Sequence, residues 1–517
     1  MRFSFVFLAL LPVAATADPL FVNRSGDLGI THEYVGAWEY FVGGGVATFD
    51  CDGDLLPELF VAGGEEPAKL FRNQSALDGK VSFVENTPEE LGLTGVTGAY
   101  PLDINSDGYL DLFVMRVGEN RIILGGKNCA FHDASEALNL STAQRWTTAF
   151  SATWEGDNIR PTLAIGNYVN RHDPAGPFEA CDTNVLLRPQ GSKYDASIAL
   201  EPAFCPLSML FSDWGRNGRQ DLRVSNDRHY YVRDGSEQIW AMEETPRPFD
   251  TDDGWQNFSI WGMGIASRDL NGDGLPEIFL TSMGDQKMQV LDATRGGPSF
   301  VDATFDRGTT AHRPYLGGDG RPSTGWHVEF GDVDNDGLDD VFIAKGNVDQ
   351  MMGSAMDDPN NLLMQNSDGN FTEKGDIAGI ASLVRSRGGA LVDLNLDGRL
   401  DLVVVNRRAP MEIYENMTEA GNWLLLDIHQ EGINPNAVGA WVEIVGDDSP
   451  RYREITVGGG HASGSATLLH FGLGEVSDVK IRVVWPDGVV SGWLGADANQ
   501  VLHISRDGSK LVGISVR

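Results

Sequence analysis

Residues 332–343 read Asp-Val-Asp-Asn-Asp-Gly-Leu-Asp-Asp-Val-Phe-Ile, an acidic nine-residue turn followed directly by an apolar run. The turn has the pattern D-x-[DN]-x-D-G-x-x-[DE], and full copies begin at Asp103, Asp269, Asp332 and Asp393. Each copy precedes a run that is typical of a β-strand, such as Leu-Phe-Val after the first. Because a motif that returns with its flanking strand at a steady period is the signature of a repeat architecture, these turns decide the fold.

Three weaker copies complete the series. The copy at Asp50 keeps all four acidic positions but has its glycine two places early, at Gly53. The copy at Asp213 keeps the frame and has no side chain at its third position, and the stretch from Trp154 to Thr162 aligns only by its flanks. The seven first positions are 51 to 63 residues apart, which predicts seven units of one supersecondary size.

Each unit reads as four strands. A small-residue apolar segment such as 44–49 precedes the turn, an apolar run follows it, a third run such as 69–72 comes next, and a fourth begins at a phenylalanine such as Phe83. Four strands per repeat with glycine-rich first strands predict an all-β fold, a seven-bladed β-propeller. The last unit has only three strands, so we expect residues near Leu20 to Asn23 to supply its outer strand and close the ring.

The predicted organisation has three parts. Residues 1–17 contain a charged residue, an apolar run and small residues in the order of a cleavable secretory signal. The propeller is expected over 18–418, and alternating strands and turns predict a small C-terminal β module over 422–506. No later segment is long and apolar enough to span a bilayer, so we expect a secreted, extracellular protein, periplasmic in a Gram-negative host.

The turns have the composition of calcium-binding loops. Positions 1, 3, 5 and 9 carry carboxylate or amide oxygens, and glycine at position 6 permits the positive φ that wraps the chain back. Ca²⁺ prefers such oxygen ligands, whereas Mg²⁺ demands a stricter octahedron. We expect about five Ca²⁺ sites. The predicted ligands are Asp50, Asp52, Asp54, Glu58, Asp103, Asn105, Asp107, Asp111, Asp269, Asn271, Asp273, Glu277, Asp332, Asp334, Asp336, Asp340, Asp393, Asn395, Asp397 and Asp401.

An alternative reading of the turns needs no metal. One isolated copy of this pattern can be simply a good turn sequence with Asx caps, although five copies in register favour a metal. The sequence leaves open whether the turn at Asp213 binds a cation, and it predicts none at Trp154.

The charge limits the partners. The chain has 39 Lys and Arg against 74 Asp and Glu, a formal net charge of −35. This excess repels phosphate backbones and anionic head groups, so nucleic acid and membrane insertion are not expected, and cations are the natural ligands. The expected partner is an extracellular protein or glycan that the sequence does not identify.

The four cysteines form no C-x-x-C pair, which argues against zinc or thioredoxin chemistry and favours disulfides in an oxidising compartment. Three pairings are possible. We favour Cys181 with Cys205, which lie in one Pro- and Gly-containing excursion, and free buried thiols remain the alternative.

No catalytic constellation is found, because the chain has no H-E-x-x-H, G-x-S-x-G or P-loop sequence. His327 and His229 could line a central channel, although structural histidines are the commoner case. A glycan-binding lectin or a polysaccharide-acting enzyme built on the same propeller stays open as the alternative function, since fold does not determine function.

The acidic loops resemble the FG-GAP/VCBS repeats of integrin α-like propellers. The whole chain resembles the cartilage acidic protein family, with an ASPIC/UnbV-like module carried by Asn422-Trp423-Leu424, His470-Phe471-Gly472-Leu473-Gly474 and 484–488. The chain departs from that family at the stretch 458–463, Gly-Gly-Gly-His-Ala-Ser. The resemblance implies calcium binding, secretion and an extracellular adhesion or binding scaffold, with no reaction.

Overall fold

The computed structural model describes residues 18–140, 143–176, 179–227, 234–310, 321–446 and 450–516. These residues confirm the predicted all-β class. Apart from α1 (Ser25–Leu28) and the short helices η1 (Trp38–Phe41) and η2 (Phe305–Arg307), the named elements are strands. The predicted signal peptide and His229 lie outside the described residues. None of the helices described is long and apolar enough to cross a membrane.

Four-stranded antiparallel units follow one another along the chain, with their strands in sequence order, and a short strand pairing joins the second and third units into one sheet. The first units are β2 (Val46–Phe49), β3 (Glu58–Val61), β4 (Lys69–Asn73), β5 (Phe83–Glu85); β6 (Val96–Leu102), β7 (Asp111–Gly118), β8 (Arg121–Gly126), β9 (Ala130–Asp133); and β10 (Arg145–Thr153), β11 (Thr162–Asn167), β12 (Asn184–Leu187), β13 (Ser197–Leu200).

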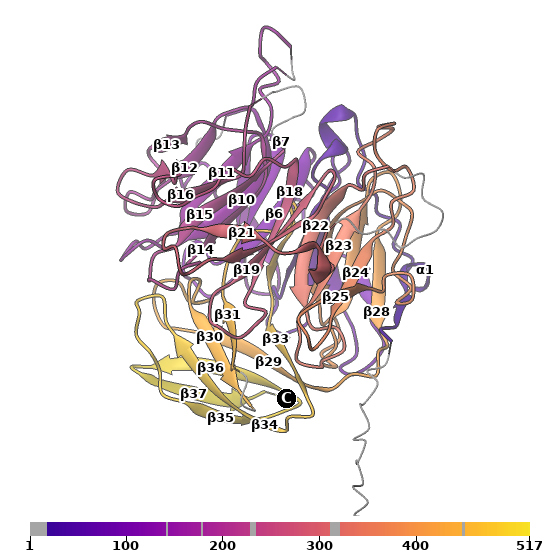
Figure 1. Ribbon diagram of the computed structural model, residues 1–517, viewed down its shortest axis with the longest axis vertical. Coiled ribbons are helices and arrows are strands. Elements are labelled where there is room, and N and C mark those ends of the chain that lie inside the picture. Colours follow the sequence, from indigo (N-terminus) through magenta and orange to yellow (C-terminus); the bar gives the residue numbers. More distant parts are fainter. Residues whose placement is uncertain are drawn as a thin grey trace, which may run out of the picture.

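The series continues through the second half of the chain in the same way (Figure 1). These units are β14 (Pro206–Ser212), β15 (Asp221–Asn226), β16 (Gln238–Ala241), β17 (Arg247–Pro248); β18 (Gly262–Arg268), β19 (Glu277–Ser282), β20 (Lys287–Leu291), β21 (Phe300–Asp302); β22 (Gly325–Gly331), β23 (Asp340–Lys345), β24 (Asn361–Gln365), β25 (Phe371–Glu373); and β26 (Ser386–Val392), β27 (Asp401–Asn406), β28 (Glu412–Asn416).

The first strands of the units pack side by side. β2 contacts β6, and the contacts continue through β10, β14, β18 and β22 to β26, which contacts β2 again. These strands are almost entirely buried. Every acidic turn lies between the first and second strands of its unit, so all the turns emerge at the same end of the first strands.

The N-terminal strand completes the last unit, as predicted. β1 (Phe21–Asn23) pairs antiparallel with β28, and Phe21 lies opposite Asn416. The Phe21 side chain is only 4% exposed and packs in the same apolar cluster as Tyr414. Strand pairing therefore joins the two ends of the repeat series, which leaves β28 without an open edge.

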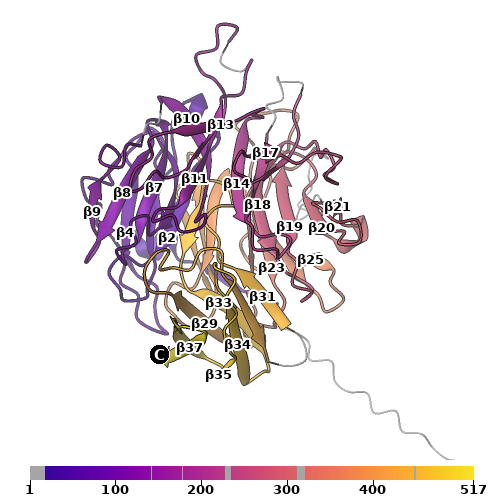
Figure 2. The same cartoon turned by 90° about the vertical axis from the view of Figure 1, so that its left-hand side faces the viewer.

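The C-terminal module consists of two packed four-stranded sheets at one end of the molecule (Figures 1 and 2). One sheet has the order β33 (Leu469–Gly474), β29 (Asn422–His429), β36 (Gln500–Asp507), β37 (Lys510–Ser515). The other has the order β31 (Pro450–Glu454), β30 (Trp441–Val445), β34 (Asp478–Val484), β35 (Leu494–Asp497). A shared apolar core that includes Leu426, Val442 and Ile481 holds the sheets together, and β37 extends the module beyond residue 506.

Two disulfides cross-link the repeat series. The favoured pair, Cys181–Cys205, is confirmed, and Cys51 bonds to Cys129 across a separation of 78 residues. The second bond ties the acidic turn of the first unit to the β8–β9 turn of the next. In the chain-entropy model, a cross-link over such a loop raises the free energy of the unfolded chain by about 4–5 kcal/mol. Disulfides are typical of oxidising compartments.

Replacing Phe21 by alanine tests the contribution of β1. The change removes a buried ring from the edge of the last unit and is expected to lower the free energy of unfolding by about 3–5 kcal/mol. Leu20→Ala, at a neighbouring side chain that is 49% exposed, is the matched control. Denaturant titration of the two variants measures the difference, and equal midpoints would contradict a closing role for this strand.

Candidate metal loops and the docked C-terminal module

The first carboxylate of each acidic turn holds the turn together. In the Asp332 turn, Oδ1 accepts the Asp336 N–H at 3.1 Å and Oδ2 accepts the Gly337 N–H at 2.8 Å. The equivalent bonds recur at Asp103 and Asp393. In the Asp50 and Asp269 turns, Oδ1 instead accepts the N–H of the fourth residue, and Oδ2 accepts that of the sixth. Position 1 therefore determines the shape of the loop before any ligand is considered.

The backbone takes the left-handed conformation at two positions of each loop, the fourth and the sixth. In the Asp332 turn these are Asn335 at φ 55° and Gly337 at φ 98°. The Asp50 turn has Gly53 at its fourth position, at φ 85°, and Leu55 at its sixth, at φ 71°. A glycine relieves strain at either position, so the early glycine leaves the loop shape intact and moves the strain to Leu55.

Position 9 ties the loop to the third strand. Asp111 is fully buried; its Oδ2 accepts the Ile104 N–H within the loop, and its Oδ1 accepts the Gly125 N–H on β8, both at 2.8 Å. The other predicted position-9 residues are Glu58, Glu277, Asp340 and Asp401. Each accepts one N–H from its own loop and one from the third strand, except that Glu277 accepts its second bond from the Asn271 side chain. The sequence suggested a ligand at position 9 and did not reveal this backbone role.

The position-5 carboxylates form hydrogen bonds within their own turns. The position-5 carboxylates of Asp54, Asp107, Asp273, Asp336 and Asp397 each accept the N–H two residues ahead, at 2.8–3.0 Å. One oxygen from each of Asp332, Asp334 and Asp336 lies within 4.8 Å of the others. The structure thus brings together three of the predicted ligands in the Asp332 turn, and it likewise groups Asp50, Asp52 and Glu58 in the first turn.

Two third-position oxygens are buried without a hydrogen-bond donor among the described residues. They are Asp52 Oδ1 and Asn395 Oδ1, in different loops. A buried oxygen with no partner is costly, and a cation would satisfy it. With the carboxylates beside them, they form a hard oxygen set of the kind that Ca²⁺ prefers.

Burial makes these carboxylates reluctant to ionise. It raises the pKa of Asp111 to about 8 and those of Glu58 and Glu277 to about 7. In the Asp332 turn, burial and the neighbouring carboxylates raise the pKa of Asp336 to about 6 and that of Asp332 well above its ordinary value. A bound cation would favour the charged forms, so protons compete with metal for these loops.

The turn at Asp213 keeps the loop shape but has a different set of side chains at the ligand positions. Asp213 still accepts the Asn217 and Gly218 N–H groups, both at 2.8 Å. Arg219 binds the position-9 residue Asp221 through two hydrogen bonds at 2.8 and 3.0 Å. A guanidinium therefore supplies positive charge beside the position-9 carboxylate. Arg72 does the same beside Asp52 and Glu58 in the Asp50 turn, and Arg399 does so beside Asp397. What sets the Asp213 turn apart is the missing third-position side chain.

The acidic turns support the C-terminal module, which the sequence did not reveal. A Cβ built on Gly472 would lie 2.0 Å from Asp332 Oδ2, so only a glycine fits against this loop. The Trp423 ring packs over Gly398 of the next loop. Glu454 accepts the Asp213 N–H at 2.7 Å, so the turn without a third-position side chain is also used for docking. Two of the motifs that resemble ASPIC/UnbV thus contact the loops directly.

Residues 457–466 of the module run between the first strands of the repeat units. Val457 O accepts the Ala152 N–H of β10, and Tyr100 of β6 donates its hydroxyl to Gly459 O at 3.0 Å. Single β-bridges join the segment to β6, β10, β14 and β18, and β32 (Gly464–Ala466) pairs parallel with β2. Residues 458–463, the stretch that departs from the family resemblance, therefore lie on the axis around which the first strands pack.

His461 anchors this axial segment. Its Nε2 accepts the Gly43 N–H at 3.0 Å, so this nitrogen is unprotonated, and burial lowers the pKa of the ring to about 3. The His461 N–H is donated to Nδ1 of His327 at 3.1 Å. His327 lies on the axis, as the sequence suggested, and there its ring accepts a hydrogen bond from the C-terminal module.

A cavity of about 610 Å³ remains between the loops and the module. Its walls include Asp50, Tyr109 and Asp393 from the turns and Asp427 and His429 from β29. Residues 457–460 of the axial segment form part of the cavity wall.

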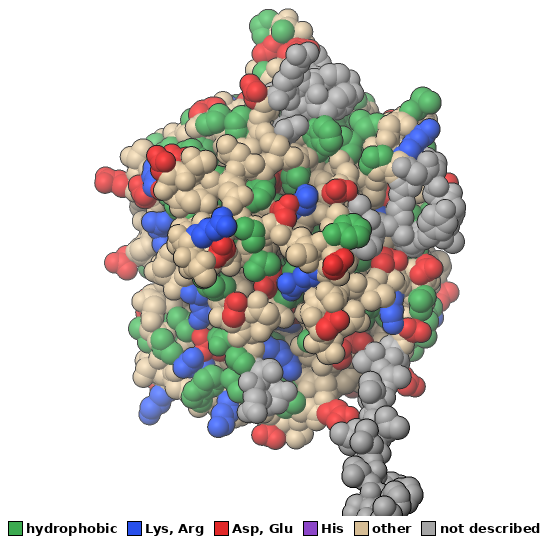
Figure 3. Space-filling view, in the orientation of Figure 1, with side chains coloured by type: hydrophobic (Ala, Val, Ile, Leu, Met, Phe, Trp, Pro, Cys, Tyr) green, Lys and Arg blue, Asp and Glu red, His purple; other side chains and the backbone are tan. Residues whose placement is uncertain are grey.

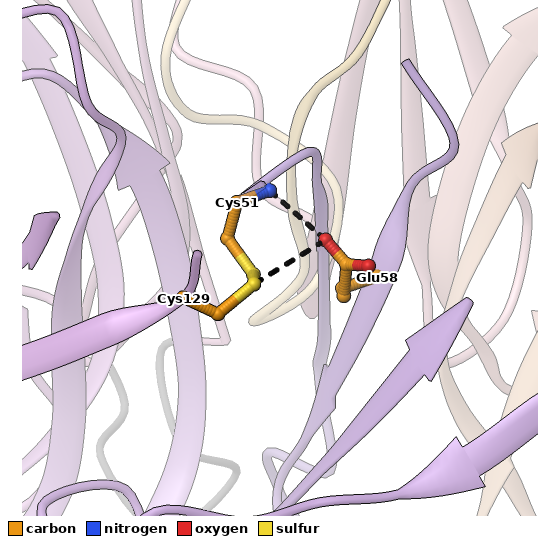
Figure 4. Close-up of side chains that lie close together, drawn as sticks. All are labelled: Cys51, Glu58 and Cys129. Carbon is orange, nitrogen blue, oxygen red and sulfur yellow. Dashed lines mark hydrogen bonds between the residues drawn. A yellow bond between two sulfur atoms is a disulfide. The ribbon is translucent and has the colours of Figure 1, made fainter. Parts of the chain in front are cut away.

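Glu58 lies beside the Cys51–Cys129 disulfide (Figure 4). Its Oε2 accepts the Cys51 N–H at 2.9 Å and lies 4.0 Å from the Cys129 sulfur. Because both sulfurs are bonded to each other, they are no thiolate ligands. The disulfide instead fixes the second residue of the Asp50 turn.

Comparison with known families gives matches to both the repeat units and the C-terminal module. Residues 430–511 match a family described as ASPIC and UnbV, and residues 50–114 and 269–343 match an FG-GAP-like repeat. The predicted resemblance is therefore shown for both parts of the chain.

Curated relatives of the chain carry one name. Cartilage acidic protein 1 of Mus musculus and that of Homo sapiens are each 26% identical over 251 residues, which is 47% of this chain. The match spans only 37% of the mouse protein and 36% of the human one. The Xenopus tropicalis protein is 30% identical over 110 residues, 20% of this chain and 17% of its own.

Solved structures resemble the chain more distantly. A crystal structure of BBS1N in complex with ARL6DN has a TM-score of 0.45 at 11% identity and covers 77% of this chain and 97% of its own. A lectin of Agrocybe aegerita that recognises non-reducing terminal N-acetylglucosamine has a TM-score of 0.36 at 15% identity, over 78% of this chain and 94% of its own.

Replacing His461 by alanine tests the axial anchor. The Gly43 N–H loses its buried acceptor, so the free energy of unfolding is expected to fall by about 1–3 kcal/mol. His132→Ala, on the exposed side of β9, is the control and is expected to unfold like the wild type. Equal denaturation midpoints for the two variants would contradict an anchoring role.

The pH dependence of the metal-free protein follows from the raised carboxylate pKa values. Between the unfolded pKa, about 4, and the folded pKa of about 8 for Asp111, the folded state binds more protons than the unfolded chain. Stability in EDTA is therefore expected to fall as the pH rises through this range. Melting curves between about pH 5 and pH 8 measure the slope. Asp111→Asn should flatten it, whereas Glu136→Gln, at an exposed side chain, should not.

Proposed function

We propose that this chain is a secreted, calcium-binding, seven-bladed β-propeller that acts as an extracellular binding or adhesion scaffold. The four-stranded units would be the blades, and the return of the first-strand contacts from β26 to β2 supports a closed ring. The two disulfides support an oxidising compartment. The FG-GAP-like and ASPIC/UnbV matches support a binding scaffold.

The proposed Ca²⁺ sites are the five turns that keep oxygens at positions 1, 3 and 5. When bound, the ion would supply positive charge and join loop oxygens that otherwise repel or lack a partner. The chain's own residues do the rest: position 1 shapes the loop, positions 3 and 5 offer oxygens, and position 9 ties the loop to the third strand. The turns at Asp213 and Trp154 are not proposed as sites.

The observation that carries the proposal is the position of the loops beneath the C-terminal module. The Asp332 loop touches Gly472, the Asp393 loop touches Trp423, and the Asp269 loop approaches Pro450 through Gly272. Cations held there would stiffen the surface on which the module rests. Calcium would therefore determine how rigidly the two modules are joined.

The module leaves the opposite end of the propeller for a partner. That end carries the excursion after β11, which projects away from the module in Figure 1. The face drawn in Figure 3 mixes Asp and Glu with Lys and Arg and has no broad basic area, which suits a protein or glycan better than a nucleic acid. The axial segment fills the position where a propeller enzyme or lectin could hold a ligand, so a scaffold is the function that the geometry favours.

Calorimetry with Ca²⁺ and with EDTA tests the proposal. Ca²⁺ binds the folded loops and not the unfolded chain, so the melting temperature is expected to rise with calcium concentration. Asp334→Ala and Asp397→Ala should reduce this rise, because each removes a loop oxygen. Asp252→Ala, at an exposed carboxylate outside the loops, is the control. A melting temperature that calcium leaves unchanged would overturn the calcium assignment.

A further inference from the structure

A second cluster of metal-ligating side chains lies in the C-terminal module and contains no residue of the acidic turns. Asp427 and His429 are on β29, and His503 is on β36 directly beside Asp427 in the parallel pair. His429 Nε2 lies 2.6 Å from Asp427 Oδ1, and His503 Nδ1 lies 2.8 Å from Asp427 Oδ2. The two imidazole rings stack with their centroids 5.1 Å apart. One ligand atom from each residue lies within 4.8 Å of the others.

The cluster is on the sheet face that turns away from the module's own core. Leu426 and Ile428, which alternate with the cluster residues along β29, are buried in that core. On the other face, Leu425 packs against Leu56 of the Asp50 turn. The cluster residues continue this second face, and Asp427 and His429 border the cavity between module and loops.

These side chains have no packing role that would explain them. All three are partly exposed, so no apolar core requires an imidazole pair here. They come from two strands, and both rings direct a nitrogen at one carboxylate. The sheet register and the two hydrogen bonds to Asp427 hold the three groups together, which is how a rigid element preorganises a metal site.

We propose that Asp427, His429 and His503 bind a late first-row divalent cation of the Zn²⁺ class. Two imidazoles and one carboxylate are the donor set that such ions prefer, whereas Ca²⁺ selects oxygen alone. Three protein ligands leave at least one coordination position for water or for a group entering from the cavity. The site therefore differs in chemistry from the acidic turns and does not depend on them for its ligands.

The ion would replace two hydrogen bonds by two coordinate bonds. In the metal-free protein each ring nitrogen that faces Asp427 carries a proton and donates it to a carboxylate oxygen. In the metal-bound protein the same nitrogens offer their lone pairs, and the protons move to the outer nitrogens of the rings or to solvent. No side chain needs to come from another element for this exchange.

Isothermal titration of the full chain with Zn²⁺ tests the site. Excess Ca²⁺ is present throughout, so that the oxygen loops are occupied and do not compete. We expect one Zn²⁺ per chain in the wild type, and more than about tenfold weaker binding in His429→Gln and in His503→Gln. His132→Gln, an exposed histidine on β9, is the matched control and should bind like the wild type.

Two further measurements keep the outcome clear. Asp427→Asn retains the size of the side chain and removes its charge, so weak Zn²⁺ binding with an unchanged melting temperature would support ligation rather than loss of fold. Co²⁺ in place of Zn²⁺ should give visible absorption bands that both histidine variants lose. No Zn²⁺ binding by the wild type, or equal binding by the double histidine variant, would overturn the proposal. Neither result bears on calcium, which is measured by the loop variants.

Discussion

The structure depends on buried carboxylates that accept backbone N–H groups inside short turns. Position 1 shapes each turn, and position 9 bonds the turn to the third strand of its unit, as Asp111 does with Gly125. A carboxylate in this role adds negative charge to a buried site, and burial raises the pKa of Asp111 to about 8. The same groups that hold the fold therefore create a demand for a proton or a cation.

The carboxylates that need a proton or a cation lie in the loops on which the C-terminal module rests. Gly472 and Trp423 rest on the loops that carry Asp332 and Asp393, and His461 reaches along the axis to Gly43. The loops therefore contact the C-terminal module directly. In the turn at Asp213, Arg219 supplies positive charge and Glu454 of the module accepts the loop N–H.

Regular patterns in the sequence predicted the features that follow from the repeat. The period of the acidic turns predicted the units, the alternation of apolar residues predicted their strands, and the incomplete last unit predicted the pairing of β1 with β28. The early glycine of the Asp50 turn looked like a defect. The loop requires left-handed backbone at two positions, and Gly53 satisfies the first while Leu55 adopts the second.

The sequence by itself determined the all-β class and the repeat, because both follow from residue types at regular spacing, and it favoured the pairing of Cys181 with Cys205. Only the tertiary structure decided where the Gly-His-Ala-Ser stretch lies, which face of the loops is covered, and that Asp427, His429 and His503 meet. Those contacts join residues hundreds of positions apart, such as Gly43 and His461. The register and packing of whole sheets set such contacts, and no local pattern of residues encodes them.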